Sequence, residues 1–244
     1  MDLTLRQKRI LAAIVKEYSE TANPVGSEEL VDKYNLQVSP ATIRNEMAAL
    51  EKQGFITQPH KSAGRIPTDA GYRFFVNELM QRFELSEKER RMLKTELVKL
   101  KAAHDSLGRS LSNLLAQVSG QAAFTLLPAQ TGSAGLSHII RDPEMHDNKV
   151  LSQVAELFDH IDQHADNLIK ASQKDIETFI GTESPLPVPK NMSLMVSKIK
   201  LKNGKKGIIG IVGPKRMSYA KNQSLLEYLA KLISGSAVII FIYI

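Results

Sequence analysis

The sequence of 244 residues contains no cysteine, and this absence removes several classes of chemistry at once. Without thiols the chain has no disulfides, no thiolate nucleophile and no zinc site of the finger type. The absence also fits a reducing compartment, and we expect a cytoplasmic protein.

Long apolar runs are also lacking. The terminal run AVIIFIYI, Ala237 to Ile244, has eight residues, whereas a membrane-spanning helix needs roughly 20. The first residues, MDLTLRQKRI, show neither the apolar core nor the cleavage site of a secretory signal. We therefore expect no membrane association. The apolar end fits a terminal strand or a partner-binding segment, and the sequence does not decide between them.

Positive charge is present, but it is placed unevenly. The net charge is +6, and residues 196–244 hold 9 Lys/Arg and 1 Asp/Glu, while residues 119–195 are acidic and residues 1–82 are nearly balanced. The basic excess lies at the C-terminal end. Overall charge is therefore no argument by itself for nucleic-acid binding by the N-terminal part.

The first fifty residues predict three helices. Apolar side chains recur at helical spacing in residues 5–21, and Asn-Pro follows this stretch. Ser27 and Ser39 then mark two helix starts, since Ser caps a helix and the Pro after Ser39 lacks only an N–H that has no partner there. The third helix is expected to run to about Gln53 and to end at Gly54.

The stretch HKSAGRIPT, His60 to Thr68, has no hydrophobic period and carries a base on either side of Gly64. Strand-like residues flank it, and the helix that follows is expected to run through Arg82. Two short strands around a basic loop, after three helices, are typical of a winged helix-turn-helix. The loop is then the wing.

The third helix has two different faces. Ile43, Met47 and Leu50 share one face and form its core side. The opposite face is small and polar, and Asn and Arg side chains bind adenine and guanine edges or phosphate. The pattern predicts DNA binding by Ser39, Ala41, Thr42, Arg44, Asn45 and Lys52 of the helix, and by His60, Lys61, Ser62 and Arg65 of the wing.

Apolar residues recur from residue 93 onward in alternating steps of four and three. The positions are Leu93, Leu97, Leu100, His104, Leu107, Leu111, Leu114 and Val118. This heptad pattern predicts one long helix, which either packs on its own chain or forms a two-fold dimer seam. The dimer seam is the favoured interpretation, with His104 as a polar position that sets the register.

The C-terminal half predicts a small α+β part with a mixed sheet. The expected order is a Gly/Ser/Pro-bearing linker after Gln121, a helical stretch at about 149–175, a strand at Ile176 to Ile180, strands at 194–201 and 207–212 joined through Asn-Gly, and a helix at 220–233.

Catalytic and metal-binding patterns are weak. His160 and His164 are four apart on an expected helix, but no Glu follows the first His as in zinc proteases, so a polar surface is favoured over a metal site. Glycines recur every third residue from Gly204 to Gly213 without the Gly-Lys-Ser/Thr ending of a phosphate-binding loop. No Ser-His-Asp set can be assigned. We expect neither an enzyme nor a cofactor.

Three stretches resemble the HrcA family of bacterial heat-inducible transcription repressors: PVGSEEL, SPATIRNEMAALEKQGFITQPHKSAGRIPTDAGYRFFV and GIIGIVGPKRMSYAKNQSLLEYLAKL. The N-terminal similarity runs from about Leu3 to Leu79. The resemblance implies a dimeric repressor that binds double-stranded DNA at an inverted-repeat operator upstream of chaperone genes. It also implies dependence on the chaperonin, loss of DNA binding on heating, and a GAF-like domain that contains a dimerising insertion.

The chain departs from the family pattern between Phe124 and Pro143, where it is much shorter. We therefore expect a reduced GAF-like part, with the heptad segment carrying more of the dimerisation. The predicted α+β chain has a winged helix-turn-helix domain at 1–82, a helical dimerisation stalk at 83–120, and a truncated GAF-like domain at 121–244 with a basic hairpin and a C-terminal helix.

A function of another class stays open. The basic residues after 196 also fit an interaction protein whose C-terminal half binds RNA, an acidic protein or the chaperonin. An enzyme with a DNA-binding regulatory half is a third alternative.

Overall fold

The computed structural model describes residues 3–34, 36, 38–102, 107–128, 130–142, 145, 147–201 and 204–235. The chain forms two compact units. The first consists of Met1–Gln81 together with Lys215–Ser218, and the second of Arg82–Pro214 together with Tyr219–Ile244.

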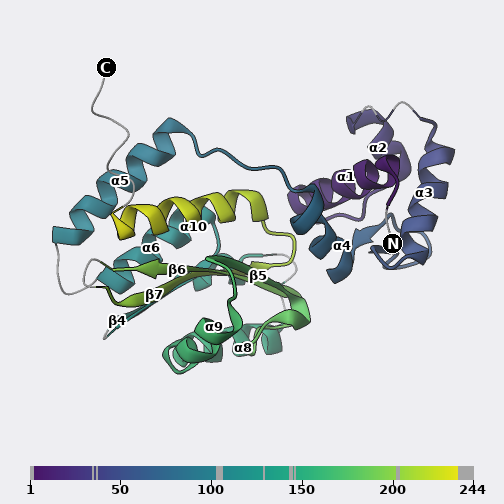
Figure 1. Cartoon of the computed structure of the whole chain (residues 1–244). Helices are drawn as coiled ribbons and strands as arrows, with labels where there is room; N and C mark the ends of the chain where they lie inside the picture. Colours follow the sequence, from purple (N-terminus) through teal and green to yellow (C-terminus); the bar gives the residue numbers. More distant parts are fainter. Residues whose placement is uncertain are drawn as a thin grey trace, which may run out of the picture. The chain divides into compact units, whose positions relative to one another are not determined.

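The first unit has the element order of a winged helix-turn-helix (Figure 1). Its elements are α1 (Leu5–Thr21), α2 (Ser27–Tyr34), α3 (Pro40–Lys52), β1 (Ile56–Thr57), β2 (Ile66–Pro67), α4 (Asp69–Phe74) and the π-helical turn η1 (Phe75–Leu79). The three predicted helices and the two short strands are confirmed. The last helix ends earlier than the expected Arg82, because the chain is extended from Met80 onward.

Side chains cap the starts of α1, α3 and α4, whereas Ser27, the expected cap of α2, is itself the first residue of that helix. Thr4 accepts a hydrogen bond from the Gln7 N–H at 3.2 Å, and the Gln7 side chain accepts one from the Thr4 N–H at 3.1 Å. Their apolar stripes meet in one core. Its fully buried members include Ile10, Leu11 and Ile14 of α1, Leu30 of α2, Ile43 and Leu50 of α3, Ile56 of β1 and Tyr72 of α4.

One carboxylate is buried in the first unit. Glu17 of α1 is 3% exposed, and it accepts hydrogen bonds from Lys33 Nζ at 2.6 Å and from the Tyr34 hydroxyl at 3.2 Å. The bond from Lys33 lowers the pKa of Glu17, whereas burial and the charge of Glu17 raise the pKa of Tyr34 to about 12. This network ties the end of α2 to α1.

The second unit is built on a five-stranded antiparallel sheet in the order β4-β3-β7-β6-β5. Its elements are α5 (Glu87–Ala102), α6 (Leu107–Ser119), β3 (Ala122–Leu127), β4 (Gln130–Ala134), α7 (Leu136–Ile140), α8 (Asn148–Asp159), the 3-10 turn η3 (Ile161–His164), α9 (Ala165–Ala171), β5 (Ile176–Ile180), the 3-10 turn η4 (Gly181–Glu183), β6 (Met192–Lys200), β7 (Lys206–Pro214) and α10 (Tyr219–Ser234).

Helices cover both faces of this sheet, as Figure 1 shows. On one face α6 packs on β3 and β4, and α10 packs on β6. On the other face α8 and α9 bury Val154, Leu157 and Leu168 against Phe124 and Leu194 of the strands. Because both faces of the sheet are covered, its inner strands carry apolar residues on both faces. The second unit therefore has an apolar layer on each side of the sheet.

The predicted linker after Gln121 is wrong. The chain there forms the hairpin of β3 and β4, followed by α7. All six residues of β3 are buried, and β3 pairs with β7 along Ala122 to Leu126, so it is an inner strand of the sheet. The apolar run AAFTLL was the signal for this strand, but the Gly and Ser residues of β4 obscured it.

The predicted single long helix is also wrong, and the structure contradicts an exposed dimer seam. The heptad segment forms α5 and α6, which pack against each other, and α5 also packs on α10. Leu93, Leu97, Leu111 and Leu114 are at most 5% exposed within their own chain. Leu100 and Leu107 are half-buried, and His104 lies outside the described residues. A heptad stripe shows which face of a helix is covered, but not by what.

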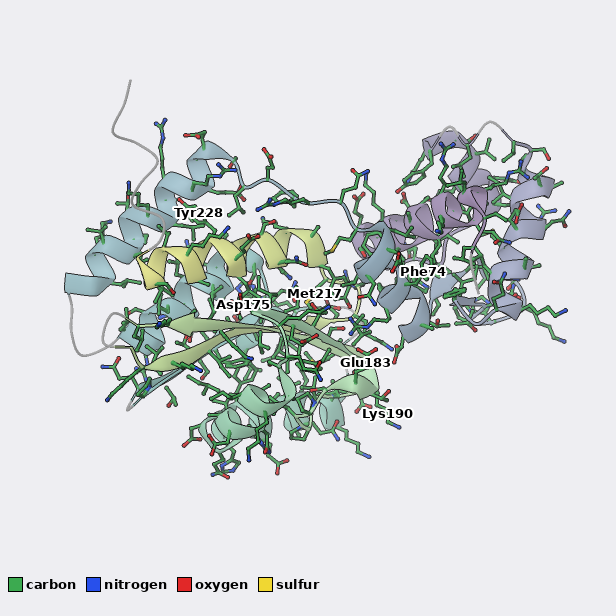
Figure 2. The ribbon with its side chains drawn as sticks, in the orientation of Figure 1. Phe74, Asp175, Glu183, Lys190, Met217 and Tyr228 are labelled. Atoms are coloured by element: carbon green, nitrogen blue, oxygen red, sulfur yellow. The ribbon has the colours of Figure 1, made fainter. Side chains whose placement is uncertain are left out.

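The α5–α10 contact includes polar groups. The Tyr228 hydroxyl of α10 donates a hydrogen bond to the Arg90 carbonyl of α5 at 3.4 Å, and Figure 2 shows Tyr228 between the two helices. Burial raises the pKa of Tyr228. The residues expected to form a stalk at 83–120 are therefore part of the second unit and its core.

The remaining C-terminal elements are largely confirmed, but the expected mixed sheet is wrong, because all neighbouring strands of the sheet are antiparallel. The strand at Ile176 to Ile180, the two strands of the hairpin and the last helix are β5, β6, β7 and α10, while the helical stretch is interrupted between α8 and α9. The Asn203 turn position and the tail from Ala237 to Ile244 lie outside the described residues. Among the helices that the structure describes, none is both long and apolar enough to span a bilayer.

We expect Glu17→Gln to lower the free energy of unfolding of the first unit by about 1.5 kcal/mol at pH 7, because the hydrogen bond from Lys33 to a buried carboxylate is replaced by one to a neutral amide. The pKa of Glu17 is lowered in the folded state, so the carboxylate stabilises the fold above its ordinary pKa. This contribution disappears as the pH falls through the lowered pKa. Hydrogen exchange of α1 and α2 amides should therefore show a difference that shrinks below about pH 4.

The matched control for Glu17 is Glu29→Gln. Glu29 also pairs with Lys33, at 2.9 Å, but its side chain is 36% exposed. Exposed pairs contribute little, and we expect a change below about 0.5 kcal/mol. Equal effects of the two substitutions would contradict the importance of the buried carboxylate.

We expect Leu97→Ala to destabilise the second unit by about 2–4 kcal/mol, because removing a buried Leu side chain leaves a cavity. Val98→Ala is the control, since Val98 is 64% exposed beside the 3% exposed Leu97. Hydrogen exchange of α5 and α10 measures the stability, and sedimentation measures the association state. If Leu97→Ala dissociated an assembly without lowering the stability of the second unit, the dimer-seam interpretation would be supported instead.

Candidate nucleic-acid interface

α3 begins with a side-chain cap that the sequence predicted. Ser39 Oγ accepts a hydrogen bond from the Thr42 N–H at 3.2 Å and lies 3.0 Å from Thr42 Oγ1, and Pro40 is the first helical residue. Gly54, with φ of +80°, ends the helix in the left-handed region that favours glycine. Both ends of the candidate recognition helix are therefore fixed by local chemistry.

The two faces of α3 are arranged as predicted. Ile43, Met47 and Leu50 are buried, whereas the opposite side is open to solvent. Its exposed residues are Ser39, Ala41, Arg44, Asn45, Ala48 and Lys52, and Thr42 is half-buried beside them. This face can offer two cations, Arg44 and Lys52, and the amide of Asn45 to a DNA groove, with little steric obstruction from its alanines. The DNA contacts themselves stay a prediction.

The wing has an internal hydrogen-bond frame. Its strands pair Ile56 with Pro67 and Thr57 with Ile66. Gln58 Nε2 donates to the carbonyls of Lys61 at 3.0 Å and Ala63 at 2.9 Å, so one amide side chain closes the tip.

Three of the predicted wing residues lie together at this tip. His60, Lys61 and Ser62 are all exposed, and His60 Nδ1 lies 3.2 Å from Ser62 Oγ. The arrangement presents Lys61 to solvent on a fixed backbone. A cation held in this way can reach phosphate or a minor groove.

Arg65 differs from the other predicted DNA contacts because it already has an anionic partner. Its Nη2 lies 2.9 Å from Glu51 Oε2 on α3, and its Nε donates to the same oxygen at 3.1 Å. The guanidinium therefore holds the wing to α3. A phosphate contact by Arg65 would have to compete with Glu51.

The backbone of Arg65 fixes the wing to another segment. Its N–H donates to the Val25 carbonyl and its carbonyl accepts from the Val25 N–H, both at 2.9 Å. Gly64 comes so close to this segment that a Cβ would lie 2.4 Å from the Val25 oxygen. A side chain at position 64 would push the wing away from the residues before α2.

Sequence reasoning missed three residues of the candidate interface. Gln58, Glu51 and Val25 set the position of the wing without being predicted to touch DNA. A Gln after a strand and a Glu in a helix are too common to signal such a role. The Gly within the basic loop was the one available sign of a close backbone approach.

The structure gives no support to the weaker metal alternative. Among the described residues there is no group of three or more His, Cys, Asp or Glu side chains that could hold a metal ion. His160 follows the end of α8, where its Nδ1 lies 3.2 Å from the amide nitrogen of Gln163, and His164 ends the turn η3. These residues form part of a polar helix surface.

Two family models match the chain and together reach both units. The model for a winged helix-turn-helix transcription repressor, HrcA DNA-binding, matches residues 2–81, and the model for the HrcA protein C-terminal domain matches residues 70–222. The second match alone covers more than half of the chain.

Curated relatives named heat-inducible transcription repressor HrcA are similar over part of their length. The protein of Chloroflexus aggregans is 48% identical over 126 residues, which are 52% of this chain and 34% of the relative. That of Desulforudis audaxviator is 46% identical over 134 residues, 54% of this chain and 39% of the relative. The chain therefore aligns with less than half of the length of these relatives.

A solved structure shares the overall fold. The crystal structure of a hypothetical protein at 2.2 Å resolution matches with a TM-score of 0.73 and 20% identity, over 96% of this chain and 97% of the other. At this identity the likeness concerns the fold alone. With both units matched by family models, the chain belongs to the HrcA family.

Proposed function

We propose that this chain is a DNA-binding transcription repressor of heat-shock genes. The observation that carries the proposal is the exposed face of α3, with Arg44 and Asn45, beside a wing whose tip presents Lys61. The first unit also has the helix order of a winged helix-turn-helix, and the relatives from Chloroflexus aggregans and Desulforudis audaxviator are named heat-inducible transcription repressors. A repressor of this kind acts in the cytoplasm and needs no catalytic site.

In the proposed complex α3 lies in the major groove. Thr42, Arg44 and Asn45 contact base edges or phosphates, with Asn45 suited to adenine and Arg44 to guanine or phosphate. Lys61 of the wing contacts the backbone or enters the minor groove. Arg65 holds the wing beside α3 through its ion pair with Glu51. In the proposed complex Arg65 therefore supports the wing and does not make the DNA contact expected from the sequence.

An inverted-repeat operator calls for two copies related by a two-fold axis, because each half-site then meets the same surface. We therefore propose a homodimer on DNA. The buried heptad leucines do not supply its interface. Sedimentation with and without a single operator duplex tests the stoichiometry, with two chains per duplex expected and one chain contradicting the dimer.

Loss of repression on heating is the regulatory part of the proposal, and the chaperonin is its proposed partner. A gel shift with the promoter region of the protein's own chaperone genes, with and without chaperonin, tests this dependence. We expect chaperonin to raise the fraction of chain that binds operator after mild heating. An identical fraction in both samples would contradict the chaperonin role and leave DNA binding intact.

A second candidate function is binding of RNA or an acidic protein through the end of the β6–β7 hairpin. Lys200, Lys205 and Lys206 are exposed there, and this is the observation that favours it. Replacing Lys205 and Lys206 by Gln should abolish such binding without changing operator affinity. The same replacements would lower operator affinity if the hairpin, and not the first unit, held DNA.

We expect Asn45→Ala to cost about 1–3 kcal/mol of discrimination between operator bases, because one bidentate base contact is lost. Binding to unrelated DNA should stay nearly unchanged. Competition binding with single-base operator variants measures the discrimination at each position. A uniform loss for all sequences would assign Asn45 to the phosphate backbone.

We expect Lys61→Ala to weaken binding to every sequence and to reduce the slope of log affinity against log salt by about 1, because one phosphate contact is removed. Lys170→Ala removes the same charge from an exposed position of α9 in the second unit and serves as the control. An unchanged salt slope for Lys61→Ala would remove the wing tip from the DNA interface.

A further inference from the structure

Four residues of the first unit come from far along the chain. Lys215–Ser218 follow the end of β7 and precede α10, but they group with Met1–Gln81 and not with the residues on either side of them. Met217 of this segment is 3% exposed. The compact DNA-binding unit is therefore not made of the N-terminal residues alone.

Two cations attach this segment to the helices of the first unit. Lys215 Nζ forms an ion pair with the Asp69 carboxylate, with side-chain exposures of 27% and 35%. Arg216 Nη1 donates a hydrogen bond to the Ser19 carbonyl at 3.5 Å. Both cations are thus engaged within the protein.

Both contacts are made at helix ends. Ser19 lies in the last turn of α1, which carries no basic residue of its own, and a cation there meets the negative end of the helix dipole. Asp69 is the first residue of α4 and carries the negative charge that suits a helix start. The segment therefore links the end of α1 to the beginning of α4.

The beginning of α4 is also the base of the wing. Thr68 caps α4 by accepting from the Gly71 N–H at 3.1 Å, and it donates to the Gly54 carbonyl at 2.6 Å. β2 immediately precedes Thr68, so movement of the α4 start displaces the returning strand of the wing. The residue that Lys215 holds is next to this junction.

We propose that Lys215 and Arg216 are positioning residues for DNA binding: they hold the α1 end and the α4 start so that the wing keeps its place beside α3. The proposal rests on the DNA-binding function proposed above and adds residues that lie outside the winged-helix stretch. Basic residues in a DNA-binding protein are ordinarily read as phosphate contacts. Here the anionic partner Asp69 and the carbonyl of Ser19 indicate a different role.

The two roles predict opposite effects for the partner residue. If Lys215 contacted phosphate, Asp69→Asn would remove a nearby negative charge and raise DNA affinity. If Lys215 acts through Asp69, losing either partner loosens the same contact and lowers affinity. Lys215→Gln and Asp69→Asn each replace a charged side chain by a neutral one. The direction in which Asp69→Asn changes DNA affinity therefore distinguishes the two roles.

The test uses the full chain with Lys215→Gln, Asp69→Asn and the double substitution, and Lys170→Gln of α9 as an exposed control of equal charge change. Operator affinity is measured over a range of salt concentrations. We expect each single substitution to lower affinity about five-fold, and the double substitution to lower it by about the same factor, because both remove one shared contact. The salt slope and the affinity of Lys170→Gln should stay as in the unaltered chain.

A second readout does not depend on DNA. Hydrogen exchange of the free protein should show faster exchange at the α4 start and in β2 for Lys215→Gln, Asp69→Asn and Arg216→Gln, and not for Lys170→Gln. Unchanged exchange in the three variants would overturn the structural link. A salt slope reduced by about 1, or higher affinity of Asp69→Asn, would overturn the positioning role in favour of phosphate contact.

The two readouts also separate this proposal from the function on which it rests. If the unaltered chain bound no DNA, the repressor function would be contradicted and the positioning role would fall with it. Faster exchange in the variants would then still report that the segment holds the first unit together. Normal binding by all variants with normal exchange would contradict the positioning role alone.

Discussion

The place of the wing depends on Arg65. Its backbone pairs with Val25 before α2, and its guanidinium pairs with Glu51 on α3, so a single residue joins three segments that are distant in sequence. Gly64 approaches Val25 so closely that a Cβ at this position would clash with the Val25 carbonyl. A wing held in this way is already in position when DNA arrives, and less conformational freedom is lost on binding.

Much of the first unit could be predicted because its signals are local. Ser39 with Pro40, the Gly after α3 and the basic loop each act within a few residues, and the structure has them where they were expected. The partner of Arg65 could not be predicted in this way. Which carboxylate a guanidinium meets is decided by the packing of α3 against the wing, and Glu51 looks like any other helix residue in the sequence.

The second unit shows the limits of periodicity more clearly. The leucine stripe correctly marks the buried faces of α5 and α6, but its covering surface is the rest of the same unit, as with Leu93 and Leu111. Apolar residues at β3 were absorbed into an expected linker because β4 is rich in small polar residues. In both cases the apolar residues are buried, as their pattern indicates, but only the tertiary structure shows which element covers them.

The candidate DNA-binding unit is held together by residues from distant parts of the chain. The chain belongs to a family of transcription repressors, and it aligns with only part of the length of its curated relatives. What the structure adds is a DNA-binding unit whose wing is fixed by Arg65 and Glu51 and whose helix ends are held by Lys215 and Arg216. In the proposed complex these four residues touch no DNA and act by holding the recognition surface in place.

The central claim is that α3 enters the major groove of an operator. Dimethyl sulfate footprinting on the promoter DNA of the protein's own chaperone genes tests it most directly, because the reagent methylates guanine N7 in that groove. The account predicts protection of guanines in two symmetric half-sites separated by about one helical turn or a multiple of it. Bound DNA without any protected guanine N7 in guanine-containing half-sites would contradict it.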